Sequence, residues 1–201
     1  MLFFVETPLK LVALTIDDAP NAEVTPRILD VLKAHSAHAT FFLIGDYVAG
    51  NEHLLERMRQ DGHELGNHLF YDERSVCLHP SNFERQLLEV DRIVQPGPSK
   101  WCRPGGGWYR KWMLEKMEKH GYRACLASVY PFDPYIRNAR LISAYLRWRV
   151  FPGCIVVLHD GKAEREQAVQ VLERVLPALH EHGYRVVTVT ELVSAASRSR
   201  D

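Results

Sequence analysis

Two adjacent carboxylates, Asp17 and Asp18, follow the apolar run 11–16 and precede Pro20. A run of aliphatic and β-branched residues that stops at a proline predicts a buried strand, which would carry both carboxylates at its C-terminal end. Neighbouring carboxylates repel each other unless a cation lies between them, although aspartates are also common in solvated turns. The pair alone therefore leaves a charged functional site and an ordinary turn both open.

Other reactive side chains also follow strand-like runs: His68 and Asp72, Arg103 before a run of glycines, Asp133, and His159. In a parallel β/α barrel the catalytic residues lie at the C-terminal ends of different strands, so these groups would meet at one end of the molecule. Two carboxylates and a histidine form a hard, open metal site, and a metal-activated water is a competent nucleophile near neutral pH. The pattern favours metal-assisted hydrolysis over covalent catalysis.

The elements that must position these residues alternate along the chain. Strands are predicted at 11–17, 39–44, 63–68, 100–104, 124–128, 155–159 and 186–190. Helices are predicted from residue 25 and at 51–60, 81–95, 110–120, 140–150 and 163–182. This alternation indicates a parallel α/β architecture, and no glycine-rich phosphate loop follows the first strand, which disfavours a dinucleotide fold. We expect a distorted β/α barrel of about seven parallel strands in a single domain, 1–201, with its core at about 11–192.

Several helix ends carry local signals. Thr25 before Pro26 predicts an N-cap, and Ser81 with Glu84 predicts a capping box. Three helices are predicted to end at a glycine that is followed by a His or Tyr and a charged residue, namely at Gly62, Gly121 and Gly183. Most histidines lie near such ends and are interpreted as structural or surface residues: His35, His38, His53, His63, His120, His180 and His182.

Composition excludes other classes of protein. Lys plus Arg and Asp plus Glu number 25 each, and no basic run occurs, so nothing indicates a nucleic-acid partner. No apolar stretch is long enough to span a membrane, and Glu6 comes too early for a secretion signal. The sequence is compatible with a cytoplasmic protein and with a secreted protein whose leader has been removed. It does not indicate the oligomeric state. The cysteines, which form no C-x-x-C pair, exclude a zinc ribbon but not a disulfide.

Five motifs occur in order: T-I-D-D-A-P at 15–20, H-A-T-F-F-L-I-G at 38–45, G-H-E-L-G-N-H at 62–68, R-P-G-G-G at 103–107 and I-V-V-L-H-D-G at 155–161. In these motifs the chain resembles the polysaccharide deacetylase family, the NodB-homology domain of carbohydrate esterase family four. The resemblance implies a distorted barrel and the metal-dependent removal of acetyl groups from glycans that contain N-acetylglucosamine, such as chitin, chito-oligosaccharide or peptidoglycan. It also implies one divalent metal ion, zinc in the first place and cobalt or nickel otherwise.

The resemblance further implies roles in proton transfer. Asp17 corresponds to the general base and Arg103 to the residue that orients it. His159 corresponds to the general acid, and Asp133 to the carboxylate that orients it and keeps it protonated. The backbone N–H of Gly106 would stabilise the oxyanion.

The metal ligands implied by the resemblance are Asp18, His68 and Asp72. Asp72 departs from the family pattern, which usually has a second histidine there, and His79 is the alternative ligand. Gly105 stands in place of the usual second proline of the arginine motif. Aromatic residues beside the motifs are expected either to stack against sugar rings or to pack on the barrel rim: Trp108, Tyr109 and Tyr130, with Phe132 and Tyr135.

Pro134 stands where the family usually has a tryptophan after Asp133, so an ordinary Asp-Pro turn is the alternative interpretation of Asp133. Two other functions also stay open at this point. One is hydrolysis of a small amide, such as a cyclic imide or an allantoin-like compound, on the same barrel. The other is a carbohydrate-binding descendant without activity, which the presence of both Asp17 and His159 disfavours.

Overall fold

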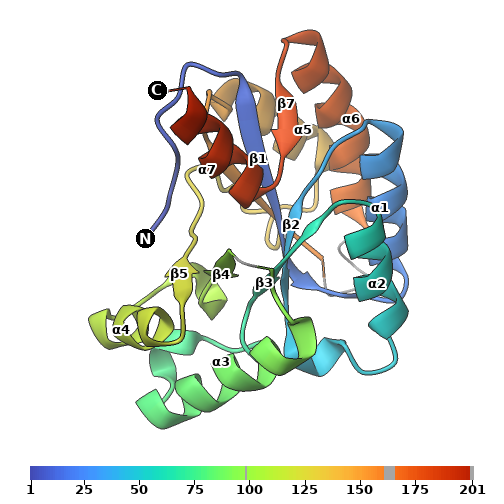
Figure 1. The fold of residues 1–201 in the computed structure, drawn as a ribbon. Helices are drawn as coiled ribbons and strands as arrows, with labels where there is room; N and C mark the ends of the chain where they lie inside the picture. Colours follow the sequence, from blue (N-terminus) through green and yellow to red (C-terminus); the bar gives the residue numbers. More distant parts are fainter. Residues whose placement is uncertain (98, 161–165, 200–201) are drawn as a thin grey trace.

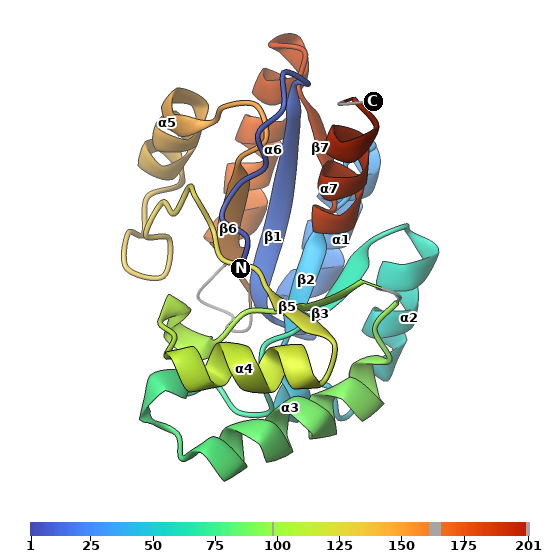
Figure 2. The same cartoon turned by 60° about the vertical axis from the view of Figure 1, so that its left-hand side comes forward.

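The computed structural model describes residues 1–97, 99–160 and 166–199. Within these residues seven strands form one parallel sheet in the order β5-β4-β3-β2-β1-β6, with β7 also paired to β1. The strands are β1 (Leu11–Ala19), β2 (Thr40–Leu43), β3 (Glu64–Asn67), β4 (Lys100–Cys102), β5 (Tyr122–Ala124), β6 (Ile155–His159) and β7 (Arg185–Val187). The sheet curls around a common interior (Figures 1 and 2), which confirms the predicted distorted barrel of parallel strands.

Seven α-helices accompany the described strands. They are α1 (Val24–Ala34), α2 (Glu52–Gln60), α3 (Pro80–Val94), α4 (Lys111–Lys119), α5 (Ala139–Arg149), α6 (Gln167–Glu181) and α7 (Val189–Arg198). Three short 3₁₀ turns lie at η1 (Gly45–Tyr47), η2 (Ser75–Cys77) and η3 (Gly105–Gly107). The predicted start of the sixth helix at 163 lies outside the described residues. None of the described helices is both long and apolar enough to cross a membrane.

The wall between β5 and β6 is completed by residues outside the regular strands. The predicted fifth strand, 124–128, is wrong in most of its length, because β5 ends at Ala124 and the residues after it form only isolated bridges, at Cys125 to Leu2 and at Val129 to Val156 of β6. The N-terminal residue Leu2 lies beside this segment: its N–H donates to the Ala124 carbonyl at 2.8 Å and its carbonyl accepts from the Leu126 N–H at 2.8 Å. Residues that precede the predicted core at 11 are thus part of the barrel wall.

The alternation of side chains along β1 separates two apolar clusters. Val12, Leu14 and Ile16 belong to the large cluster that contains the apolar faces of α1 and α6. Leu11 and Ala13 belong to a second cluster inside the barrel, together with Phe42 and Trp101 on neighbouring strands. Because strand side chains alternate with a period of two, the next inward positions of β1 are Thr15 and Asp17. The same strand therefore supplies the apolar interior and then the polar end of the barrel.

The predicted last strand, 186–190, is wrong in its second half. The strand β7 ends at Val187, and α7 begins two residues later. Thr188 and Glu191 form a capping box, in which the Glu191 N–H donates to Thr188 Oγ1 at 3.1 Å and the Thr188 N–H donates to Glu191 Oε2 at 2.8 Å. Val189 and Leu192 join the inner cluster, so α7 fills the barrel interior at the end opposite the polar residues.

Two predicted helix caps are also wrong. Thr25 lies inside α1, where its hydroxyl accepts from the Asn21 N–H and donates to the Asp160 carboxylate. The N-cap of α3 is His79 rather than Ser81. The Thr25 hydroxyl is thus used by the distant Asp160 and not by the start of α1. At α3 the cap lies two residues earlier than predicted, because the His79 side chain accepts from the Ser81 N–H.

The carboxylate of the second predicted cap, Glu84, instead contacts Lys116, Lys119 and His120 at or near the end of α4. The three predicted helix ends at glycine are confirmed, since Gly62, Gly121 and Gly183 have left-handed φ values of +80°, +76° and +77°.

Candidate active site

An open cleft of about 520 Å³ lies at the carboxyl ends of the strands. Asp17 and Asp18 line it from β1, His68 from the end of β3, Arg103 from the end of β4 and His159 from the end of β6. Four strands that are far apart in the sequence therefore deliver charged groups to one place, as the parallel-strand rule predicts.

A β-bulge brings both aspartates into this cleft. Adjacent residues of a regular strand point to opposite faces, so Asp18 would point away from Asp17. The register of β1 against β2 shifts between Asp17 and Ala19, and Asp18 has a φ of +64°. This left-handed conformation costs about 1–2 kcal/mol for a residue other than glycine, and bulges of this kind re-aim side chains next to sites. Sequence alone gave no sign of the bulge.

Arg103 and Asp17 form a buried ion pair. The Nη1 of Arg103 lies 2.6 Å from Oδ1 of Asp17, and the two residues are 3% and 4% exposed. The same Nη1 also donates to Thr15 Oγ1 at 2.7 Å. The arginine thus fixes one oxygen of the predicted base and leaves the other carboxylate oxygen for the cleft.

The rest of the guanidinium is held by the backbone. Its Nε donates to the Cys125 carbonyl at 3.0 Å, and its Nη2 donates to the Leu126 carbonyl at 3.1 Å. The ring of Phe42 lies 4.3 Å from the guanidinium carbon. Because Arg103 is bound on all sides, its position does not depend on a ligand, and the geometry of Asp17 is set in advance.

Asp133 holds His159 with both carboxylate oxygens. The His159 backbone N–H donates to Oδ2 at 2.8 Å, and ring Nδ1 lies 3.0 Å from Oδ1. Burial opposes the charged ring, but the hydrogen bond and charge of Asp133, with the charges of Asp17 and Asp18, outweigh it and raise the pKa of His159. With Nδ1 bound to Asp133, Nε2 is the ring atom left for proton transfer.

The predicted acid and the predicted base lie on two neighbouring strands. Asp17 of β1 is the register partner of His159 of β6. Residues paired in this way lie only about 5 Å apart at Cα. The N–H of Asp160 also donates to the Asp17 carbonyl at 2.8 Å, which extends the pairing one residue past β6.

Asp18 and His68, two of the predicted metal ligands, lie together in the cleft. Nε2 of His68 lies 3.3 Å from Oδ1 of Asp18, and both residues are buried. Nδ1 of His68 lies 2.6 Å from the Arg103 carbonyl, which can only accept, so Nδ1 carries a proton and Nε2 is the ring atom turned toward Asp18. A histidine oriented in this way is typical of a metal ligand. The chemistry of these two donors therefore fits a divalent cation.

Asp72 lies on the rim of the same cleft. It is exposed, and the hydroxyl of Tyr47 donates to its Oδ2 at 3.3 Å. In the described residues, no three His, Cys, Asp or Glu side chains are grouped closely enough to hold a metal. His79, the alternative ligand, caps α3 and is not among the described residues that line the cleft. The structure thus brings two of the three predicted ligands together and leaves the third at the edge.

The glycine run after Arg103 forms a tight loop at the cleft. Gly106, with φ of +77°, and Gly107 line the cleft. The N–H of Gly105 donates to Ser75 Oγ at 2.7 Å, a bond that a proline could not make. A Cβ on Gly105 would lie 2.3 Å from the Glu73 carbonyl oxygen. The loop is therefore fixed by a hydrogen bond and close packing instead of by a second proline.

Aromatic side chains surround the entrance. Trp108 is 73% exposed and lines the cleft, and the Tyr130 ring lies 5.8 Å from the His159 ring. Tyr109 is not among the described residues that line the cleft. Phe3 does line it, although it precedes every predicted element, because the N-terminal segment runs along the barrel wall. No signal in the sequence indicated Phe3.

The cysteines take no part in the chemistry. All four are free thiols, and Cys77 is the exposed one. Cys125 lies against the Arg103 guanidinium, but burial raises its pKa to about 11. Burial also raises the pKa of Cys102. These thiols stay protonated near neutral pH and are poor nucleophiles.

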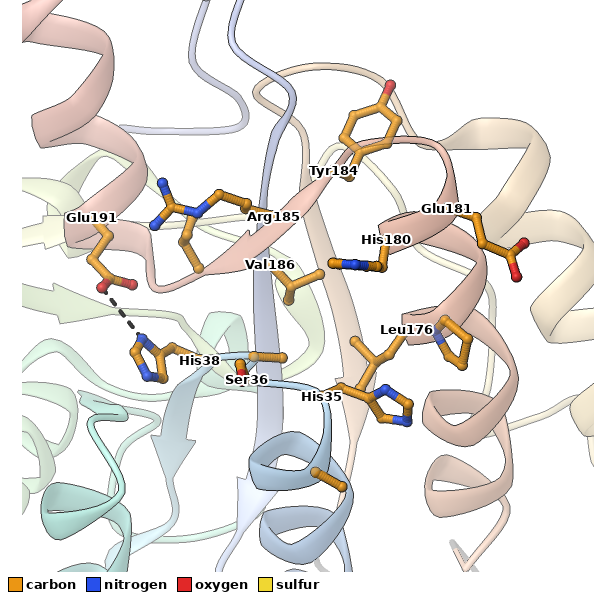
Figure 3. A pocket seen from close by; sticks show the side chains of 14 residues that line it. His35, Ser36, His38, Leu176, His180, Glu181, Tyr184, Arg185, Val186 and Glu191 are labelled. Atoms are coloured by element: carbon orange, nitrogen blue, oxygen red, sulfur yellow. Dashed lines mark hydrogen bonds and ion pairs between the residues drawn. The ribbon is translucent and has the colours of Figure 1, made fainter.

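A larger cavity of about 570 Å³ lies elsewhere, next to His38 before β2 and Arg185 of β7. Figure 3 shows His35 and His180 at its edge and the contact of His38 Nδ1 with Glu191 Oε1, at 3.3 Å. None of the predicted catalytic residues lines this cavity. It lies at the amino ends of the strands, where residues of parallel barrels serve stability rather than catalysis. The candidate active site is therefore the cleft at the carboxyl ends.

Comparison with known sequences places the chain among deacetylases. Residues 4–125 match the family model described as polysaccharide deacetylase. The chain is 35% identical over 192 residues to a peptidoglycan-N-acetylglucosamine deacetylase of Bacillus cereus, which covers 92% of this chain and 88% of the relative. It is 34% identical over 200 residues to a chitooligosaccharide deacetylase of Bradyrhizobium, with 90% of each chain covered.

Solved structures of this family share the fold of the chain. A peptidoglycan N-acetylglucosamine deacetylase in complex with 4-naphthalen-1-yl-N-oxidanyl-benzamide superposes with a TM-score of 0.89 at 28% identity, covering 95% of this chain and 91% of that one. A CE4 family pseudoenzyme of Bacillus anthracis superposes with a TM-score of 0.84 at 26% identity, covering 94% and 67%. Because a pseudoenzyme shares this fold, activity has to be argued from the residues of the site.

Proposed function

Because the chain belongs to the polysaccharide deacetylase family, we propose that it hydrolyses the acetamide group of N-acetylglucosamine units in a glycan. The observation that carries the proposal is the pairing of Asp17 with His159 across neighbouring strands. Each of the two is held by its own buried partner, Arg103 or Asp133. A binding module has no need of an oriented acid and an oriented base at the same cleft.

The chain's own residues account for the proton transfers. Asp17, ionised and held by Arg103, accepts a proton from the water that attacks the acetamide carbon. The N–H of Gly106 donates to the oxyanion that forms, an interaction worth about 3–4 kcal/mol where a single such donor has been removed. Nε2 of His159 then gives its proton to the nitrogen as the C–N bond breaks. Acetate and a free amine are the products.

A divalent metal ion belongs to this proposal. Asp18 and His68 would hold it, with Asp72 as the third ligand and zinc as the preferred ion. The bound ion supplies a Lewis acid and lowers the pKa of water. The protein's part is to orient the His68 ring through the bond between Nδ1 and the Arg103 carbonyl, so that Nε2 is the atom offered to the ion, and to orient Asp72 through Tyr47.

The shape of the cleft favours an extended glycan. It is open, and its rim carries the exposed aromatic side chains Trp108, Phe132 and Tyr135. Flat aromatic surfaces of this kind can stack against sugar rings. The deacetylases to which the chain is similar are named for peptidoglycan and for chitooligosaccharide, and N-acetylglucosamine is common to both polymers.

Acetate release from a substrate panel tests the proposal. We expect release from chito-oligosaccharides or peptidoglycan and none from cyclic imides or allantoin-like amides. The His159→Gln variant should release about 10²–10⁴ times less, which is the usual share of a general acid. A matched control is His120→Gln, which removes a half-buried histidine that contacts Glu84 away from the cleft. Turnover of a cyclic amide without glycan deacetylation would instead support the small-amide hydrolase.

A further inference from the structure

One stretch of the chain carries positive charge without any carboxylate. Between Asp133 and Asp160 there are four arginines and no Asp or Glu, although the whole chain is neutral. The four, which are Arg137, Arg140, Arg147 and Arg149, are all exposed. Within the described part of the chain none of them forms an ion pair, whereas Arg57, Arg85 and Arg103 do. The charge of this stretch is therefore free to act on a partner.

The same stretch exposes large apolar side chains on α5. Leu141, Ala144 and Trp148 are spaced i, i+3 and i+7, which places them on one face of the helix. Leu141 is 62% exposed and Trp148 is 76% exposed. Ile142 and Leu146 lie on the opposite face and are buried against the barrel. The helix is thus apolar on its outer face as well as on its inner face, which core packing does not explain.

Arginines border this outer face. Arg140 and Arg147 lie seven residues apart, two helical turns, along one edge of the Leu141–Trp148 stripe. Arg149 lies at the end of α5 with its guanidinium carbon 5.4 Å from the Trp148 ring. We call Leu141, Trp148 and the arginines at 137, 140, 147 and 149 the α5 surface.

The α5 surface continues at both of its ends. Tyr135, which also lines the active-site cleft, is 78% exposed just before α5. Phe151 follows α5, and its ring packs edge-on against the exposed ring of Phe4 at 6.1 Å. Figure 2 shows α5 at the outer edge of the molecule, away from α3 and α4. A large flat partner could reach it there without meeting these helices.

The charge of the α5 surface determines the kind of partner. A second copy of this chain, docked by the same surface, would set arginines against arginines with no carboxylate on that surface to neutralise them. The partner must therefore be anionic, and it must also accept the side chains of Leu141 and Trp148. An anionic phospholipid bilayer meets both needs, because tryptophan and leucine enter the headgroup region while arginines bind phosphates.

We propose that the α5 surface binds this protein to the surface of an anionic phospholipid bilayer. Trp148 and Leu141 lie at headgroup level, and the four arginines contact lipid phosphates. Each basic residue near such a surface strengthens binding by roughly fivefold, so four arginines give a much higher affinity for the bilayer than one. The bilayer then lies beside the Tyr135 end of the active-site cleft.

Sedimentation of the whole chain with lipid vesicles tests the proposal. We expect binding to vesicles that contain phosphatidylglycerol, weaker binding at high salt, and none to vesicles of phosphatidylcholine alone. The Arg140→Gln/Arg147→Gln variant should bind roughly 30-fold more weakly. The matched control is Arg85→Gln/Arg92→Gln, which removes the same charge from the exposed face of α3 and should bind like the wild type. Both variants should keep full activity on a soluble chito-oligosaccharide.

Fluorescence gives a second measurement that depends on insertion. The chain has four tryptophans, and insertion of Trp148 should shift the emission to the blue when phosphatidylglycerol vesicles are added. The Trp148→Phe variant should lose the shift and still sediment. The proposal is overturned if the wild type does not bind phosphatidylglycerol vesicles, or if the arginine variant binds as well as its control. Binding to poly-glutamate or DNA without binding to vesicles also overturns it, in favour of an acidic polymer.

Discussion

Arg103 Nη1 lies 2.6 Å from Asp17 Oδ1, with both side chains buried beneath the active-site cleft. The pair has two consequences. It orients the carboxylate that we propose as the base, and it places a charge in the interior that needs its partner. Removing one member of a buried pair leaves the other charge uncompensated, which gives Asp17 a structural role beside the catalytic one that we propose.

Two substitutions separate these consequences. Asp17→Asn keeps an oxygen for Arg103 but removes the base, so kcat should fall by about 10²–10⁴. Both Asp17→Asn and Asp17→Ala leave the Arg103 charge uncompensated, so both should lower the free energy of unfolding, by about 3–5 kcal/mol for Asp17→Ala, which also removes the hydrogen bond. Steady-state kinetics and urea unfolding measure the two effects. A near-normal kcat for Asp17→Asn would show that Asp17 is not the base, and wild-type stability of both variants would argue against a structural role.

The pH dependence of activity reports on Asp133. The pKa of His159 lies above its ordinary value of 6.5, so the ring is protonated below that raised pKa and loses its proton as pH rises through it. Asp133→Asn removes the carboxylate that raises the pKa. We expect the alkaline limb of kcat/KM to move to lower pH in this variant. An unchanged limb would mean that His159 is not the acid or is not held by Asp133.

The same pair contributes to stability with a defined sign. Since the folded pKa of His159 is raised, its contribution is fully present below the unfolded pKa and disappears as pH rises through the folded one. The stability difference between wild type and Asp133→Asn should therefore be larger at about pH 6, below the unfolded pKa of histidine, than above the folded pKa of His159. Glu84→Gln is the control, because it removes a carboxylate from His120 rather than from the cleft and should leave the kcat/KM profile unchanged.

Metal affinity distinguishes the two candidates for the third ligand. Asp72→Ala should weaken zinc binding by about tenfold or more, and Tyr47→Phe should weaken it less, because Tyr47 only orients Asp72. His79→Ala should bind as tightly as the wild type, since His79 caps α3. Titration calorimetry with zinc measures all three. The opposite ranking, with His79→Ala weak and Asp72→Ala unchanged, would make His79 the ligand.

The glycine loop gives a prediction about stability. A Cβ at Gly105 would lie 2.3 Å from the Glu73 carbonyl oxygen, so Gly105→Ala forces the backbone apart. We expect a loss of about 1–3 kcal/mol, measured by thermal or urea unfolding. At Gly97 an added Cβ would meet no atom within 4 Å, which makes Gly97→Ala the matched control. If both variants unfold alike, close packing at Gly105 is not what holds the loop.

Much of the fold and the site could be predicted from the sequence, because the signals are local. The run before Asp17 has the composition of a buried strand, and His159 ends a similar run. Parallel strands deliver their C-terminal residues to one edge, so the two had to lie near each other. The ordered motifs then indicated the family. The capping box of Thr188 and Glu191 was equally local, and it could have revealed α7 in place of the predicted strand.

What only the tertiary structure decided depends on contacts between distant residues. Arg103 reaches Asp17 across 86 positions, and the bulge at Asp18 exists only in the register of β1 against β2. Phe3 lines the cleft because the N-terminal segment bridges β5 and β6, and Asp72 stays at the rim beside Tyr47. The sequence by itself determined which groups arrive at the cleft, since strand ends are local. Their mutual orientation arises from pairing and packing between strands, which no local pattern contains.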